Sequence, residues 1–352
     1  MISLNQSQRI VSAKRSFVTR RVPIELMQTL VTGIQTPKAG DLVLAKVTLL
    51  GHHKRSERVD GRRATLFQGD EVILAYGNRY APDQFEAIVP DSMEPCHMVA
   101  AGGIAGKALS WHHKIDFPTE ITPIGLIGNA EGKIINLSDF SVHPPATTQL
   151  IPNVVVVGTS MNAGKTTSAA HIIHGLTKAG YQVGAMKVTG TGAGGDLWLM
   201  QDAGAHSAID FTDAGYPTSF NVKLNELNDI VEKLSAELIH RGCNAIVVEI
   251  ADGVYQRETR ALLQNPSFKA NYRNIVFTAR ESLGATSGAQ WLTDQGYYVP
   301  AISGMICASP LAHREAAKQI DVPVYGLEQL VEPRIAKSLL NFPVALEEKI
   351  SA

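Results

Sequence analysis

The chain has 352 residues, of which 45% are hydrophobic and 18% charged, a globular ratio that excludes wholesale disorder and coiled coil. Its 32 Lys and Arg residues nearly balance its 33 Asp and Glu residues, so the net charge gives no global attraction for nucleic acid or anionic lipid. The cysteines Cys96, Cys243 and Cys307 form no CxxC pair, and no apolar stretch approaches the roughly 20 residues of a membrane helix or the apolar core of a signal peptide. We therefore expect a cytoplasmic protein with no nucleic-acid partner and no membrane partner.

Residues 1–150 are rich in short apolar runs that are broken by Gly, Asp and Pro. Two Gly-Asp turns each begin a strand-like run, one over residues 40–47 and the other over residues 69–76. Between them, Asp60-Gly61 is a turn signal of the hairpin kind, and residues 123–137 form a second hairpin candidate. Short strands with regular turns predict a smaller β-rich, barrel-like domain over residues 1–150.

In residues 151–352, apolar strands alternate with helical patterns. The expected strands cover residues 153–157, 182–187, 245–250, 274–278, 298–303 and 322–325. The expected helices cover residues 166–179 and 225–241, a stretch from the end of the fourth strand to about residue 295, and residues 310–319. This alternation predicts an α/β fold with a mostly parallel sheet covered on both faces.

The strongest functional signal is the phrase VVVVGTSMNAGKTTSAA, in which a buried strand ends in a Gly-containing loop that leads into a helix. This order is the one that a phosphate-binding loop requires, because glycines let backbone N–H groups turn toward an anion at a helix N-terminus. Lys165 would reach the β- and γ-phosphates, and the Thr166 hydroxyl would bind Mg²⁺. The first glycine lies one place earlier than in the ordinary GxxxxGK[ST] pattern. The residues expected to bind the nucleotide are Gly158, Thr159, Asn162, Ala163, Gly164, Lys165, Thr166 and Thr167.

The loop sequence GTSMNAGKTT resembles the GTDTxxGKT phosphate loop of dethiobiotin synthetase, which has the same extra residue. That enzyme belongs to the P-loop class that includes nitrogenase iron protein, MinD and the cobyrinic acid amide synthetases. The early loop lysine of the MinD type is absent here. Residues 153–325 also resemble a domain-of-unknown-function family that includes D-glutamate N-acetyltransferases. The segments Lys187-Val188-Thr189-Gly190 and Asp210-Phe211 carry this second resemblance, which is confined to the C-terminal domain.

Three further residues complete the candidate site. Lys187 and Asp196 bracket the Gly-rich segment KVTGTGAGGD, which follows an expected strand, and ligands of open α/β sheets lie at such strand ends. Glu249 ends the strand AIVVEI, where a carboxylate can hold Mg²⁺. Alternatively, Asp196 is a helix N-cap and Glu249 only accepts backbone hydrogen bonds. The expected catalytic residues are Lys165, Lys187, Asp196 and Glu249, and the expected Mg²⁺ ligands are Thr166, Glu249 and Asp196.

These signals predict a Mg²⁺- and ATP-dependent enzyme of the kinase or ligase type. It would transfer a phosphoryl group to a small carboxylate substrate and would assemble as a homodimer or higher oligomer. A coenzyme A-dependent N-acyltransferase, in which the loop cradles the phosphates of acetyl-CoA, is an alternative. The other alternative is a nucleotide-gated partner-binding ATPase. The short and partly acidic segment 342–352 disfavours it because it offers no membrane-targeting helix.

Overall fold

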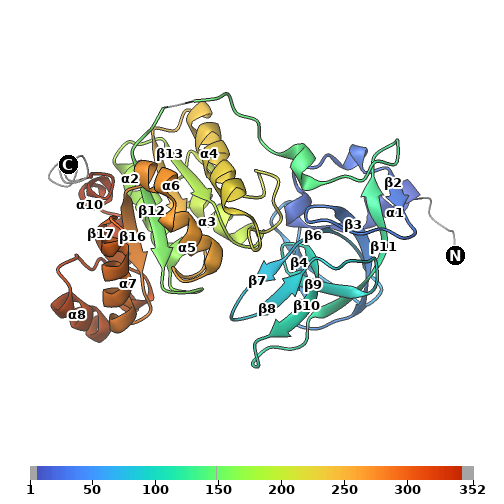
Figure 1. The fold of residues 1–352 in the computed structure, drawn as a ribbon, viewed down its shortest axis with the longest axis horizontal. Helices are drawn as coiled ribbons and strands as arrows, with labels where there is room; N and C mark the ends of the chain where they lie inside the picture. Colours follow the sequence, from blue (N-terminus) through green and yellow to red (C-terminus); the bar gives the residue numbers. More distant parts are fainter. Residues whose placement is uncertain (1–5, 148, 343–352) are drawn as a thin grey trace. The chain divides into compact units, whose positions relative to one another are not determined.

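The computed structural model describes residues 6–147 and 149–342, so most of the C-terminal segment 342–352 lies outside the described residues. The chain divides into two compact units (Figure 1). Unit 1 consists of Met1–Val142, Gly190–Gly195 and Phe211–Asn221. Unit 2 consists of His143–Thr189, Asp196–Asp210 and Val222–Ala352. None of the described helices has the length and apolar character needed to cross a membrane.

Five strands of unit 1 close into a barrel (Figure 1). They are β3 (Leu42–Leu49), β6 (Glu71–Tyr76), β9 (Cys96–Ala100), β10 (Ile104–Trp111) and β11 (Thr119–Gly128). Strand β3 pairs with β6 and β11, β9 pairs with β11 and β10, and β10 returns to β6. Only the pairing of β10 with β6 is parallel. Alternate side chains fill the barrel, so the prediction of a β-rich, barrel-like domain is confirmed.

Shorter elements surround the barrel. The strands β1 (Lys14–Arg15) and β2 (Thr29–Val31) pair with β6 and β11, and the hairpin of β7 (Arg79–Tyr80) and β8 (Phe85–Ile88) pairs with β10. A separate hairpin consists of β4 (Arg55–Glu57) and β5 (Arg63–Thr65), with the predicted turn Asp60-Gly61 between its strands. The helical pieces are α1 (Gln6–Ser12), η1 (Phe17–Thr19), η2 (Ile24–Leu26) and η3 (Leu137–Phe140).

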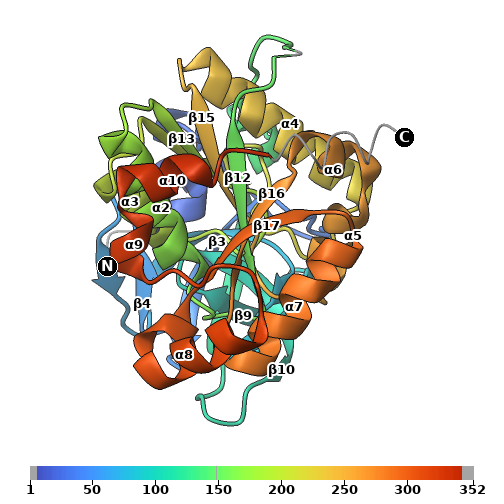
Figure 2. The ribbon, with the colours of Figure 1, turned by 90° about the vertical axis from the view of Figure 1, so that its left-hand side faces the viewer.

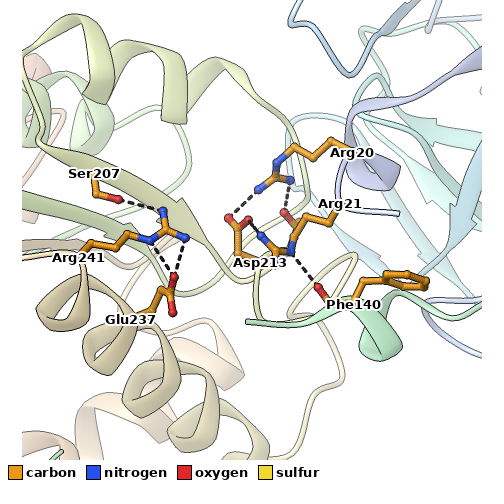
Figure 3. A network of polar contacts seen from close by, with 8 residues as sticks. Arg20, Arg21, Phe140, Ser207, Asp213, Glu237 and Arg241 are labelled. Atoms are coloured by element: carbon orange, nitrogen blue, oxygen red, sulfur yellow. Dashed lines mark hydrogen bonds and ion pairs between the residues drawn. The ribbon is translucent and has the colours of Figure 1, made fainter. Parts of the chain in front are cut away.

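A buried ion network holds the segment Phe211–Asn221 in unit 1 (Figure 3). The carboxylate of Asp213 accepts from Arg20 at 2.6 Å and from Arg21 at 3.3 Å. Arg21 also donates to the Phe140 carbonyl at 2.8 Å. Charge-assisted hydrogen bonds are stronger than neutral ones, and Asp213 is 6% exposed, so solvent screens this network weakly.

The six strands of unit 2 form one parallel sheet. In spatial order they are β14 (Ser207–Asp210), β13 (Val183–Lys187), β15 (Ala245–Glu249), β12 (Asn153–Gly158), β16 (Asn274–Thr278) and β17 (Tyr298–Ser303). All residues of β15 and β16 are buried, as expected for strands covered on both faces. The predicted α/β fold is therefore confirmed, and β12 lies between β15 and β16 in the middle of the sheet.

Helices cover both faces of this sheet; Figure 2 shows α2 and α10 on one side and α4 and α6 on the other. The valine and alanine side chains of the strands pack on α2 and on the chain end that follows β17. At its C-terminal end, α4 carries an ion pair of Arg241 with Glu237, and Arg241 also donates to Ser207 (Figure 3). The helices are α2 (Lys165–Lys178), α3 (Gly195–Asp202), α4 (Leu224–His240), α5 (Arg257–Gln264), α6 (Pro266–Asn271), α7 (Ser282–Asp294), η4 (Met305–Ala308), α8 (Pro310–Gln319), α9 (Leu327–Leu330) and α10 (Pro333–Ser338).

One predicted strand is wrong. Residues 322–325 form only a single bridge, between Val324 and Ile302. Pro323 has no N–H to donate and contributes only its carbonyl, which accepts from Ile302 at 2.8 Å. Strand β14 was not predicted, because its four residues lie within a polar stretch whose alternation is too short to detect.

Candidate functional site

The predicted phosphate loop joins β12 to α2 in unit 2. The first N–H groups of a helix have no carbonyl partner inside the helix, and the helix dipole adds partial positive charge there. Asn162 and Gly164 turn the loop into α2 with φ values of 60° and 97°. A Cβ on Gly164 would also lie 2.9 Å from the Cα of Gly304. The loop thus has the backbone shape that P-loop chemistry needs, with glycine where packing and conformation both demand it.

The early glycine of the motif has a packing reason. A Cβ on Gly158 would lie 2.4 Å from the hydroxyl oxygen of Thr278 on the neighbouring strand β16. The next residue, Thr159, donates its N–H to the Thr278 carbonyl at 2.9 Å. The sheet contact therefore continues one residue beyond β12, and the loop turns away only after Thr159. The hydroxyl of Thr159 is buried and has no hydrogen-bond partner among the described residues.

Lys165 is the first residue of α2, and it is 6% exposed. Its ammonium donates to the Ser160 carbonyl at 2.7 Å, so the side chain bends back over the loop. Burial lowers the pKa of Lys165, and the carboxylates of Glu249 and Asp252 oppose that shift. A phosphate group in the loop would supply the anion that such a buried cation lacks at close range.

Beside the loop, the ends of β13 and β15 and the start of α3 bring together a charged cluster of Lys187, Glu249 and Asp196. The Lys187 ammonium pairs with Asp196 and lies 3.6 Å from one carboxylate oxygen of Glu249. That same oxygen accepts a hydrogen bond from the Thr166 hydroxyl at 3.0 Å. The second oxygen of Glu249 is buried and has no hydrogen-bond partner among the described residues. A buried carboxylate oxygen without a donor is costly and suits a ligand or an ion.

The ionisation of this cluster is set by burial and by mutual attraction. Burial disfavours the charge of Lys187, but Asp196 and Glu249 outweigh it and hold the pKa of Lys187 above its usual range. Burial also raises the pKa of Glu249, against the pull of Lys187. For Asp196, burial is outweighed by Lys187, so its pKa lies below the usual value. Lys187 is therefore a charged ammonium at neutral pH.

The carboxylates of this cluster and the hydroxyl of Thr166 are suitable ligands for Mg²⁺. Thr166, Glu249 and Asp196 supply hard oxygen donors, and Mg²⁺ usually takes only one or two protein carboxylates and completes its shell with phosphate oxygens and waters. Within residues 6–147 and 149–342, no three His, Cys, Asp or Glu side chains are grouped so that they could bind a metal ion. Mg²⁺ would therefore need ligands other than protein side chains to complete its coordination shell. The unpartnered Glu249 oxygen is the observation that favours an ion here.

The segment after β15 also supports the loop. Asp252 has a left-handed φ of 62°, which is uncommon outside glycine. A Cβ on the next residue, Gly253, would lie 2.3 Å from the carbonyl oxygen of Thr159. The sequence analysis missed Gly253, Thr278 and Gly304 as residues that shape the loop, because each lies far from it in the chain and no motif joins them.

The close approach of Gly253 leads to the first prediction. Gly253→Ala is expected to displace the peptide group between residues 159 and 160. ATP binding should weaken by about tenfold or more, since a loop displaced by a fraction of an ångström loses hydrogen bonds to its ligand. Calorimetric titration with ATP would measure the change. The control is Gly195→Ala, whose added Cβ meets no atom within 4 Å. Equal affinities of the two variants would contradict the prediction.

Each predicted catalytic residue lies in this part of unit 2. Lys165 and Thr166 begin α2, Lys187 ends β13, and Glu249 ends β15. Asp196 lies in the first turn of α3, and its carboxylate pairs with Lys187. Parallel strands end at the same sheet edge, so residues distant in sequence meet there.

Comparison with known proteins gives only distant structural similarity. No protein-family model matches the chain, and no curated protein sequence is significantly similar to it. Similar solved structures include the signal recognition particle 54 kDa protein of Aeropyrum pernix K1 in complex with GDP, at 18% identity and a TM-score of 0.38. That match covers 58% of this chain and 50% of the other, so this chain spans about half the length of that protein.

Two further structures have comparable scores. The signal recognition particle receptor FtsY of Elizabethkingia anophelis in complex with GDP is 12% identical, with 58% of this chain and 68% of that chain covered and a TM-score of 0.39. A DUF1611 family protein of Anabaena variabilis is 12% identical, with 56% and 62% covered and a TM-score of 0.38. At such scores, function has to be argued from the residues of this chain.

Proposed function

We propose that the protein is a Mg²⁺-dependent, ATP-binding P-loop enzyme that transfers the γ-phosphoryl group to a small carboxylate substrate. The observation that carries this proposal is the cluster in which Lys187 lies between Asp196 and Glu249, with Glu249 accepting from Thr166 at the start of the P-loop helix. A buried ammonium next to a phosphate loop can bind the negative charge of an acceptor or of a phosphoryl group in transfer. The proposal includes a homodimer or larger assembly, which light scattering with nucleotide present would test.

In this proposal each residue has a distinct role. The loop N–H groups and Lys165 bind the β- and γ-phosphates and stabilise their charge. Thr166 and Glu249, with Asp196 as a second carboxylate, would hold Mg²⁺, which neutralises phosphate charge when bound. When the substrate binds, the Lys187 ammonium would release one of its two carboxylate partners and bind the carboxylate of the acceptor instead. Lys187 would then hold the acceptor in line with the γ-phosphorus.

The chemical step balances without a proton transfer. A carboxylate oxygen of the acceptor forms a bond to the γ-phosphorus while the bond from phosphorus to the bridging oxygen of ADP breaks. The products are an acyl phosphate and ADP. Because no proton leaves the nucleophile, the site needs cations and N–H donors rather than a general base. The buried Lys165 and the largely buried Lys187 would supply that positive charge.

The test of this function is a paired titration. ATP with and without Mg²⁺, and acetyl-CoA, are each titrated into the protein by calorimetry. We expect ATP to bind more tightly with Mg²⁺ and acetyl-CoA to bind weakly or not at all. Tight binding of acetyl-CoA without Mg²⁺ would favour the acyltransferase alternative. Hydrolysis of ATP that needs no carboxylate acceptor would favour the partner-binding ATPase.

Carboxylate variants provide the second prediction. Glu249→Gln is expected to raise the Mg²⁺ concentration needed for half-maximal ATP binding by at least about tenfold, because an amide oxygen is a weaker ligand than a carboxylate. Asp196→Asn should have a smaller effect in the same direction, since Lys187 already uses that carboxylate. The binding of a fluorescent ATP analogue is measured as a function of Mg²⁺ concentration. The control is Glu328→Gln, which changes an exposed residue. Unchanged curves for both variants would remove these residues from the metal site.

A further inference from the structure

The hairpin of β4 and β5 in unit 1 concentrates positive charge. Between residues 54 and 63 the chain has five cations and two acids. Arg55, Arg62 and Arg63 are exposed, and within the described residues no hydrogen bond or ion pair involves their guanidinium groups. The near-zero net charge of the chain, which led us to expect no nucleic-acid partner, sums over all residues and so hides this local excess.

The two acids of the hairpin do not neutralise this charge at its surface. Glu57 is 4% exposed, and one of its carboxylate oxygens accepts the N–H of Gly194 at 2.9 Å, so it points into unit 1. Asp60 lies in the turn and accepts the N–H of Arg62 at 3.0 Å. Among the described residues, Lys54 forms one ion pair, a solvent-exposed contact with Asp116 at 3.5 Å, which contributes little.

The strand register places arginines on the outer face of the hairpin. Ser56 and Ala64 are paired across the strands and are both buried, whereas Arg55 and its partner Thr65 are both exposed. Because side chains alternate along a strand, Arg55 and Arg63 lie on the same face as diagonal neighbours. Glu57, the cross-strand partner of Arg63, shares this face but is buried, so the exposed charges on the face are those of the two arginines. The hairpin is fixed at its base, since Glu57 donates its N–H to the Ala101 carbonyl at 2.8 Å and Leu66 to the Lys54 carbonyl at 3.0 Å. The backbone that carries these arginines is therefore anchored by hydrogen bonds.

We propose that this face binds a single-stranded nucleic acid through its phosphate backbone. Guanidinium groups bind phosphate oxygens in a bidentate way, and arginine is the residue that the hairpin uses at four of its five cationic positions. Phe67, two residues beyond β5, is 64% exposed, and Lys14 lies 5.3 Å from its ring centroid. An exposed ring beside cations suits the stacking of an unpaired base.

A membrane surface fits the hairpin less well. The turn carries Asp60 and Gly61, followed by the exposed Arg62, and has no exposed large apolar side chain between residues 58 and 62. Interfacial membrane binding needs apolar side chains that enter the lipid boundary. The arginine-rich face therefore matches a nucleic-acid strand better than a lipid headgroup layer.

The test uses the full chain and a fluorescein-labelled uridine homopolymer, with a thymidine homopolymer and a mixed-sequence DNA duplex as further arms. Fluorescence anisotropy is recorded at several salt concentrations for the wild type and for Arg55→Gln/Arg63→Gln. We expect single strands to bind the wild type more tightly than the duplex. The double variant should lose about tenfold or more in affinity, and its slope of log affinity against log salt should fall by about 1.4, since each lost phosphate contact on a single strand contributes about 0.7.

The matched control is Lys38→Gln/Lys133→Gln, which removes two exposed positive charges elsewhere in unit 1 and should leave binding unchanged. Lys165→Ala should also bind the homopolymers normally, which separates this surface from the phosphate loop. The proposal is overturned if the wild type binds no oligonucleotide at low salt or if the two double variants lose affinity equally. Preference for the duplex would overturn the single-strand assignment.

Discussion

Replacing Lys165 with alanine is expected to abolish measurable ATP binding and to leave the protein folded. The ammonium of Lys165 is the buried cation of the phosphate loop, and a charge-assisted hydrogen bond contributes about 1.5–3 kcal/mol. Lys165 would contact both the β- and the γ-phosphate, so the loss corresponds to about 100-fold or more in affinity. Calorimetry with ATP and Mg²⁺ measures it directly.

The fold should survive this change because no carboxylate within residues 6–147 and 149–342 lies at ion-pair distance from Lys165. Its side chain donates to the Ser160 carbonyl, and burial lowers its pKa, so its charge is costly without a bound anion. Thermal unfolding of the variant should match that of the wild type. The control is Lys178→Ala, an exposed lysine at the other end of α2, which should bind ATP normally. An unchanged ATP affinity in folded Lys165→Ala would refute the assignment of the phosphate loop.

Replacing Lys187 with methionine is expected to destabilise unit 2 by about 1–3 kcal/mol, the cost of leaving the buried carboxylate of Glu249 without its cation. Methionine keeps most of the volume and removes the charge, which leaves Asp196 and Glu249 close together without their cation. The cost comes mainly from Glu249, whose side chain is buried, because the side chain of Asp196 is 34% exposed and can be hydrated. Denaturant unfolding followed by circular dichroism would measure the loss.

The pH dependence separates charge from packing in this variant. Burial already raises the pKa of Glu249, and without Lys187 that pKa should rise further. The folded variant then binds a proton more readily than the unfolded chain, whose glutamates have pKa values of about 4.3. The free energy of unfolding of the variant therefore falls as pH increases. The difference in this free energy between the variant and the wild type should be smaller at acid pH than at neutral pH. A second variant, Lys187→Met/Glu249→Gln, should recover part of the loss at neutral pH. A deficit that is the same at every pH would point to packing alone.

The sequence predicted the phosphate loop and the strands on either side of it well, for a local reason. Burial on both faces makes a parallel strand a short apolar run, and the loop follows such a run directly, so β12, β15 and β16 are each recognisable within a few residues. The helix α4 was recognisable because its apolar positions recur with the helical period. That Lys187 and Glu249 lie close together could be predicted because strand ends in such sheets meet at one edge.

The partners of those residues were decided only by the tertiary structure. That Lys187 pairs with Asp196, that Thr166 donates to Glu249, and that Gly253 lies against Thr159 depend on how strands and loops pack, which no spacing records. The same holds for the arginine face of the β4–β5 hairpin, because the sequence shows the charges but not which of them point outward.

Local pattern by itself determined most strands of the parallel sheet, the α/β class and the presence of a loop of the phosphate-binding type. Tertiary structure alone decided that two segments of the second half, Gly190–Gly195 and Phe211–Asn221, belong to unit 1. Contacts such as that of Glu57 with Gly194, 137 residues apart, and that of Arg20 with Asp213, 193 residues apart, hold them there. Short-range periodicity reports the burial of a residue among its chain neighbours, whereas the choice of a distant polar partner is made only when the whole chain folds.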